Sequence, residues 1–131
     1  MGDISEHFSA REFSCPCFRC FGKERGRPSK KLLAVLEGLR ALIGRPIHIT
    51  SGYRCPQHNA EVGGVFPSEH TGDDDTTDAA DIICLGDAER FEVVRALFTL
   101  KVQRIGIGRT FIHVGVSPSL PQPCIWTYYG T

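Results

Sequence analysis

The sequence lacks any excess of charge of one sign. Its 15 Lys and Arg residues balance its 15 Asp and Glu residues, so the formal net charge is zero. A chain of this kind produces no global positive field that would hold nucleic acid or an anionic membrane surface. We therefore expect no nucleic-acid partner and no membrane partner.

Long hydrophobic runs are also absent, since no apolar segment approaches the ~20 residues needed to cross a bilayer. The polar start, residues 1–7, has no basic stretch followed by an apolar one, and it predicts no secretory signal. Internal repeats and low-complexity segments are missing too. With 131 residues and 41% hydrophobic content, the chain suits one core, so we predict a single domain over residues 1–131.

The segments that are present alternate between helical and strand-like patterns. Leu and Val recur at helical spacing between Ser29, a good N-cap, and Gly44, a helix stop. Further helices are predicted over 56–62 and from Asp87 onward, with Phe91, Val94, Leu97 and Phe98 on one face. Strands are predicted over 47–49, 79–84, 104–107, 111–116 and 124–128. This order predicts a small α+β domain with a central, largely antiparallel sheet flanked by helices.

Six cysteines are many for this length, and four of them lie in the first 55 residues. Without a secretory signal, thiols or a metal site are favoured over a disulfide framework. Cys15, Cys17 and Cys20 lie together, and Cys55 is the candidate fourth ligand of a structural zinc; a disulfide and plain buried thiols are the alternatives. A basic, Gly-rich run over 22–28 marks residues 1–28 as a cysteine-containing N-terminal arm.

Two histidines and one aspartate form a candidate metal site. The alternation of strand 111–116 places His113 on the face opposite Ile112 and Val114. His70 lies in a long loop, and Asp81 lies near the start of the strand predicted over 79–84. Two imidazoles and a carboxylate are a common catalytic zinc set that leaves a fourth position for water. From spacing alone, hydrogen-bonded histidines explain the same residues.

Four ordered blocks add a resemblance to these patterns. They are Ser51-Gly52-Tyr53-Arg54-Cys55-Pro56, Ser68-Glu69-His70, Ala79-Ala80-Asp81-Ile82 and Phe111-Ile112-His113-Val114. In this order the chain resembles the zinc D-Ala-D-Ala carboxypeptidase and endopeptidase family, which trims peptidoglycan stem peptides. The resemblance extends from about residue 7 to 116 and is strongest to small single-domain members of bacteriophages and prophages. It implies a hedgehog-like, DD-peptidase-like fold.

The resemblance also implies roles for individual residues. It places the zinc ligands at His70, Asp81 and His113. It places Arg54 beside the metal, where a planar guanidinium suits a substrate carboxylate or an oxyanion; a structural salt bridge is the alternative for this arginine. Extra residues between His70 and Asp81 make Asp78 an alternative ligand, but the Ala-Ala-Asp-Ile block favours Asp81.

The general base is the main departure from the family pattern. Relatives commonly read H-V-D at the last ligand, whereas Gly115 follows here, and neither Thr110 nor Phe111 can accept a proton. Glu69 and Asp78 are the candidate bases. The departure also keeps a non-catalytic, metal-binding cell-wall-peptide or virion structural module as an alternative, and a cysteine–zinc interaction domain as a third.

Together these features predict a monomeric, zinc-dependent peptidase that cuts peptidoglycan stem peptides as a D,D-carboxypeptidase or endopeptidase. The resemblance implies a phage or prophage lysin. Such a protein is expected in the host cytoplasm before its release to the cell wall, or associated with the virion.

Overall fold

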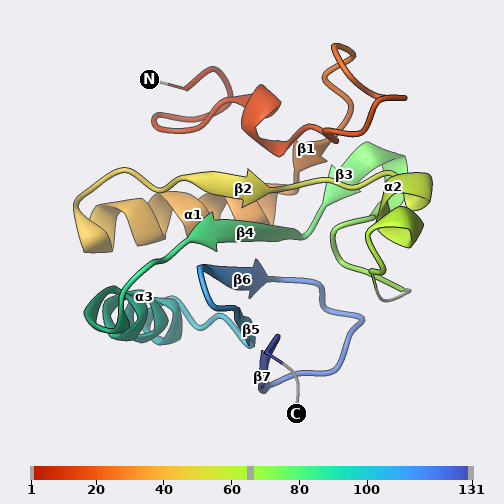
Figure 1. Cartoon of the computed structure of the whole chain (residues 1–131). Helices are drawn as coiled ribbons and strands as arrows, with labels where there is room; N and C mark the ends of the chain where they lie inside the picture. The colour runs from red at the N-terminus through yellow and green to blue at the C-terminus, as the bar shows by residue number, and fades with distance from the viewer. Residues whose placement is uncertain (1, 65–66, 130–131) are drawn as a thin grey trace.

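A five-stranded sheet forms the centre of the computed structural model, which describes residues 2–64 and 67–129 (Figure 1). The strand order is β2 (Ile49–Ser51), β4 (Ala79–Ile83), β6 (Phe111–Gly115), β5 (Arg104–Ile107) and β7 (Cys124–Thr127). Neighbouring strands are antiparallel except for β5 and β7, which pair in parallel. The predicted α+β class with a largely antiparallel sheet is therefore confirmed.

Helix α1 (Lys30–Ile43) begins and ends where the sequence predicts. The Ser29 side chain accepts a hydrogen bond from the Leu32 N–H (3.2 Å), and Gly44 adopts a left-handed conformation (φ 77°) that stops the helix. Leu32, Leu36 and Leu39 are fully buried, whereas Leu42 lies on the outer face and is 53% exposed. The leucine stripe is thus core except at its last turn.

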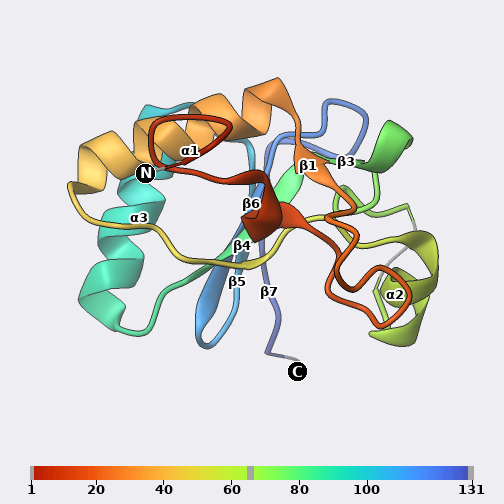
Figure 2. The ribbon, with the colours of Figure 1, turned by 90° about the horizontal axis from the view of Figure 1, so that it is seen from above.

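Helix α3 (Asp87–Thr99) lies beside α1 on the same side of the sheet (Figure 2). Its buried residues are Val93, Ala96 and Leu97, while Phe91 and Phe98 are 69% and 56% exposed. Of the expected face, Leu97 is buried and Val94 packs against the core, so the prediction is wrong only for Phe91 and Phe98. The i, i+3, i+4 stripe that meets the core starts at Val93. The N-cap is Gly86, and Asp87 lies in the first turn instead.

The two faces of the sheet carry different chemistry. Ala80 and Ile82 of β4 and Ile112 and Val114 of β6 point into the core beneath α1 and α3. Their neighbours along each strand point to the opposite face, as the period of two requires. Asp81 is paired directly with His113 in the β4–β6 register. The polar face of the sheet is therefore the face that carries the candidate site.

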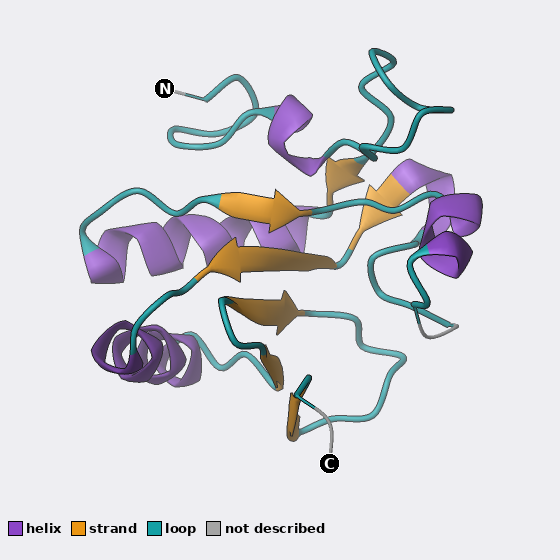
Figure 3. Cartoon of the chain, viewed as in Figure 1, coloured by secondary structure: helices purple, strands orange, loops and turns teal. Residues whose placement is uncertain are grey.

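Residues 2–28 cover one edge of the sheet and contribute to its core (Figure 3). The 3₁₀ helix η1 (Ala10–Phe13) lies beside the edge strand β2, and Phe8 and Phe13 are buried among the core residues. Strand β1 (Arg27–Pro28) pairs in parallel with β3 (Thr76–Thr77), which follows the 3₁₀ helix η2 (Asp73–Asp75). This arrangement protects an otherwise open sheet edge.

The remaining helix, α2 (Pro56–Glu61), lies on the polar side together with the loop that leads to β3 (Figure 1). None of the helices in residues 2–64 and 67–129 combines the length and apolarity needed to cross a membrane.

Candidate metal centre and cleft

His70, Asp81 and His113 converge on one point at the polar face of the sheet. The Asp81 Oδ1 atom lies 3.1 Å from His113 Nδ1 and 3.5 Å from His70 Nε2. One ligand atom from each of the three residues lies within 4.8 Å of the others. Asp81 and His113 are held by the β4–β6 register, and the loop before η2 brings His70 to them.

The environment of His70 suits a metal ligand. Its Nδ1 lies 2.7 Å from the Gly52 carbonyl oxygen, so Nδ1 is the protonated nitrogen that donates, and Nε2 carries the free lone pair. Among the residues that the structure describes, Nε2 is buried and has no hydrogen-bond partner. A buried imidazole nitrogen without a donor is costly unless a cation binds it. The three residues therefore fit the zinc that the sequence predicts.

Glu69 orients His113 from the opposite edge of its ring. The Glu69 Oε2 atom lies 2.6 Å from His113 Nε2 and accepts a hydrogen bond from Arg104 Nε (3.0 Å). Its Oε1 atom accepts from the Ser117 N–H (3.2 Å). A carboxylate on one imidazole nitrogen fixes the tautomer and leaves the other nitrogen to a metal. Here that other nitrogen is Nδ1, which faces Asp81.

The charges of the cluster are set by its hydrogen bonds. Burial raises the pKa of Asp81, but the contacts with His113 and His70 outweigh it and hold this pKa well below its usual range. Burial likewise opposes the ionisation of Glu69, yet His113 and Arg104 lower its pKa overall. Burial lowers the pKa of His70, which favours the neutral imidazole that a metal requires.

His113 differs from His70 because two carboxylates face it. Burial acts to lower its pKa, but hydrogen bonds with Asp81 and Glu69 raise it overall. A metal cation at Nδ1 would compete with the proton that these carboxylates favour.

Gly115 explains how Glu69 reaches His113. A Cβ atom at position 115 would lie only 2.1 Å from Glu69 Oε2, so the carboxylate occupies the volume that a side chain there would need. The Glu69 carboxylate therefore lies beside His113 in the volume that a side chain at position 115 would take.

A cleft of about 800 Å³ opens in front of the cluster. Its lining comes from the residues on either side of α2, the following loop, β5, β6, β7 and the loop before β7. It includes Arg54, Ser68, Glu69, His70, Arg104, His113, Leu120, Trp126 and Tyr128. The centre of the Trp126 ring lies 5.2 Å from that of the His113 ring. The Arg104 guanidinium lies over the Trp126 ring, 4.9 Å from its centre. His70 and His113 of the cluster are therefore part of the cleft wall.

Arg54 lies in the cleft wall beside His70. Its Nη1 donates to Asn59 Oδ1 (3.3 Å), and its Nε is buried without a partner among the residues that the structure describes. Within the same residues, Arg54 forms no salt bridge with an acidic side chain. Its backbone N–H donates to the His70 carbonyl (3.0 Å), which fixes its distance from the cluster.

Ser68, Tyr53 and Asp78 form hydrogen bonds that hold the loop between α2 and β4 in place. Ser68 Oγ accepts a hydrogen bond from the His70 N–H (3.2 Å), and the Tyr53 hydroxyl donates to Asp75 (2.9 Å). Asp78 pairs through its main chain with Glu69 and Val116. Its carboxylate is not part of the group formed by His70, Asp81 and His113.

Four residues of the site were not singled out from sequence: Arg104, Ser117, Trp126 and Tyr128. The strands predicted over 104–107 and 124–128 include Arg104, Trp126 and Tyr128, and their alternation indicates which of these side chains share a face. The missing information was the register, in which β5 pairs Gly106 with His113 and β7 pairs Trp126 with Gly106.

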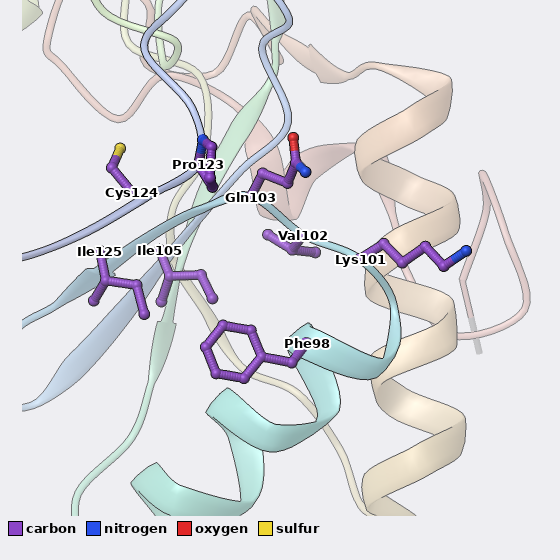
Figure 4. Close-up of a pocket in the computed structure, with 8 residues that line it drawn as sticks. All are labelled: Phe98, Lys101, Val102, Gln103, Ile105, Pro123, Cys124 and Ile125. Atoms are coloured by element: carbon purple, nitrogen blue, oxygen red, sulfur yellow. The ribbon is translucent and has the colours of Figure 1, made fainter.

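A second hollow of about 460 Å³ lies between α3, β5 and β7 (Figure 4). Its walls are mainly apolar, and Figure 4 shows Phe98, Ile105 and Ile125 beside one another. The polar cleft rather than this hollow contains the converging titratable groups.

The four N-terminal cysteines named by the sequence also come together. Cys15, Cys17, Cys20 and Cys55 are buried, and their Sγ atoms all lie within 4.8 Å of one another. They are free thiols in the structure.

The fold and the cleft together define the class of the protein: an α+β domain with a His-Asp-His group able to hold a metal ion. A family model described as peptidase M15 matches residues 6–116, and the chain belongs to this family of metallopeptidases, which are zinc-dependent in general. No curated relative matches the chain.

Proposed function

We propose that the protein hydrolyses peptide bonds in peptidoglycan stem peptides, as a D,D-carboxypeptidase or endopeptidase, with zinc held by His70, Asp81 and His113. The observation that carries this proposal is the convergence of three ligand atoms in the cleft, with His70 Nε2 buried and unpartnered in the described part of the chain. Family membership supports the reaction class, and the four sequence blocks support the substrate class.

Three protein ligands are the number typical of catalytic zinc sites, in which the remaining position is open. When bound, the ion supplies Lewis acidity, which polarises a carbonyl and makes water a nucleophile near neutral pH. His70 Nε2 and, once its proton is displaced, His113 Nδ1 would hold the ion, and the ionised Asp81 would supply negative charge.

Arg54 binds the substrate in this proposal. Its guanidinium offers a fork of donors that matches a terminal carboxylate or a developing oxyanion. Asn59 holds one end of the group, and the Arg54 carbonyl accepts from Thr71 Oγ1 (2.6 Å). These contacts limit the movement of Arg54 relative to His70, so an anchored peptide is held in one register along the cleft.

Glu69 acts as a positioning residue rather than as a base. Both of its oxygens already accept hydrogen bonds from His113, Arg104 or the Ser117 N–H. Glu69 is also only 5% exposed, so a water molecule that attacks the substrate has little access to its carboxylate. Its effect on hydrolysis is therefore exerted through the orientation of His113.

The proposal is tested by incubating the zinc-loaded protein with purified peptidoglycan and with stem peptides ending in D-Ala-D-Ala. Mass spectrometry should detect new ends, which chelation abolishes and added zinc restores. Free D-Ala indicates a carboxypeptidase, whereas opened cross-links indicate an endopeptidase. If zinc is bound but no stem-peptide library gains new amino or carboxyl ends, the proposal is wrong and the non-catalytic cell-wall-peptide module takes its place.

We also propose that the protein acts as a phage or prophage lysin, a role supported by the resemblance of its blocks to small phage-type members. Added to cells with a permeabilised outer membrane, the purified protein should lower the turbidity of the suspension. Unchanged turbidity with active protein would contradict a lytic role.

A further inference from the structure

Four buried cysteines form a second cluster away from the cleft. Cys15, Cys17 and Cys20 come from the turn-rich segment after η1, and Cys55 is the N-cap of α2. The cluster has its own small buried environment, in which Tyr53 is the neighbouring aromatic residue.

The spacing of the sulfur atoms matches metal ligands and not disulfides. The Cys15 and Cys17 Sγ atoms are 3.6 Å apart, and the Cys17 and Cys55 Sγ atoms are 3.7 Å apart. A disulfide requires about 2.05 Å. Four thiolates at about 2.3 Å from a tetrahedral zinc ion are separated by about 3.8 Å, which is close to both observed distances.

Hydrogen-bond donors and positively charged groups surround the sulfur atoms. The Cys55 N–H donates to Cys15 Sγ (3.4 Å), and the His58 N–H donates to Cys55 Sγ (3.4 Å). Two guanidinium groups add charge: Arg25 Nη1 lies 3.6 Å from Cys20 Sγ, and Arg19 Nη1 lies 3.9 Å from Cys17 Sγ. Four thiolates around one divalent cation carry a net charge of −2. The two guanidinium groups offset part of this charge, because Arg19 also pairs with Glu61 and Arg25 with Asp75.

We propose that Cys15, Cys17, Cys20 and Cys55 bind a structural zinc ion that fastens the N-terminal segment to the loop carrying Arg54. Four protein ligands complete a tetrahedral shell, so this ion has no open position for a substrate. The site is separate from the His-Asp-His group, and the proposal does not depend on the proposed hydrolysis.

The position of Cys55 gives this ion a consequence for the cleft. Cys55 directly follows Arg54, and Tyr53 N–H donates to the Phe13 carbonyl (2.8 Å) on the N-terminal side of the cluster. Gly52, which accepts the His70 hydrogen bond, lies in the same stretch. The metal therefore joins residues 15–20 to the stretch 52–55, and it limits the positions that Arg54 can adopt.

The test begins with the full chain carrying the double change His70→Ala and His113→Ala, which removes the candidate catalytic site. This variant should retain one equivalent of zinc by elemental analysis. After exchange with cobalt(II), it should show the intense thiolate-to-metal charge-transfer absorption of a sulfur-ligated tetrahedral site. Adding Cys17→Ser should abolish that absorption, whereas the matched buried control Cys84→Ala should retain it.

A second measurement keeps the test independent of whether the Cys17→Ser protein folds. Native mass spectrometry of the His70→Ala, His113→Ala protein should show one bound zinc ion and no disulfide, and thiol reagents should reach the four cluster cysteines only after strong chelation. Cys17→His should keep the metal because imidazole is also a zinc ligand. Disulfide-linked cysteines, an iron-coloured protein, or a double histidine variant without metal would each overturn the proposal.

Discussion

The two clusters of metal-ligating side chains are built from different kinds of backbone. Asp81 and His113 belong to neighbouring strands, and the ladder of hydrogen bonds sets their separation before any ion binds. The cysteines belong to turns and to a helix N-cap, where no ladder fixes them. The first cluster is preorganised by the fold, whereas the second needs its ion to hold the chain together.

The clusters also differ in closure. In the first, two of the three ligands, His70 and His113, line a cleft of about 800 Å³; in the second, four buried sulfur atoms lie close together. Open sites of three protein ligands are typical of catalysis, and closed sites of four are typical of structure. The ligand number and access thus separate the two roles more clearly than the ligand types do.

The largest expected effect comes from removing one ligand of the first cluster, which is formed by His70, Asp81 and His113. His113→Ala should reduce peptide hydrolysis to background and remove one of two zinc equivalents, because a carboxylate and one imidazole hold the ion poorly. Its unfolding free energy should fall by about 1–3 kcal/mol, because the buried Asp81 and Glu69 carboxylates lose a hydrogen-bond partner while the aliphatic core on the other face stays intact. Metal analysis, activity and denaturant unfolding measure the three quantities.

The exposed His48→Ala is the matched control for this change and should keep both zinc ions and full activity. A His113→Ala protein that still hydrolyses stem peptides would show that the two clusters do not divide the roles as described.

Arg54→Lys should have the next largest effect, lowering turnover by about 10²-fold with both zinc ions retained. A lysine keeps the charge but loses the planar fork that can hold a carboxylate or an oxyanion with two donors. Steady-state kinetics on a D-Ala-D-Ala peptide and metal analysis test this expectation. Arg95→Lys, on the exposed side of α3, should leave both measurements unchanged. Near-normal turnover in Arg54→Lys would make this arginine structural.

How much the sequence reveals differs between the two clusters as well. Alternation along 111–116 placed His113 opposite the aliphatic residues, and the caps Ser29 and Gly44 located α1, because these patterns are local. The contact between Glu69 and His113 joins residues 44 positions apart in the sequence, and it depends on the missing Cβ at position 115. Such contacts arise from register and loop path, which a single sequence does not contain.

The cysteines also show that a single sequence does not reveal long-range contacts. Their spacing suggested a shared site, but only the folded chain brings Cys55 to within 3.7 Å of Cys17. The exposed positions of Phe91 and Phe98 were missed for a related reason. Hydrophobicity alone does not reveal which of two adjacent helical stripes meets the core.

Glu69→Gln should weaken zinc binding at the first cluster by about 10–100-fold, the usual cost of losing a carboxylate behind a ligating histidine. Activity should then recover as zinc is added, because the ligands themselves remain. The second cluster should keep its ion throughout. Zinc titration followed by activity measures the shift, and the exposed Glu6→Gln serves as the control. Activity that is lost and does not respond to zinc would instead assign Glu69 to the chemical step.

The smallest expected effect concerns the space that Gly115 leaves for Glu69. In Gly115→Ala the new Cβ would lie 2.1 Å from Glu69 Oε2, so the carboxylate has to shift, at a cost of about 1–3 kcal/mol in unfolding free energy. Zinc affinity should fall only a few-fold, because the displaced carboxylate stays near His113. Shortening the neighbour with Glu69→Asp relieves the clash, so the double variant should be more stable than the sum of the two single changes predicts. Denaturant unfolding of all four proteins gives this coupling directly. Strict additivity would mean that Gly115 and Glu69 do not share this volume, and the link between the glycine and the first cluster would be lost.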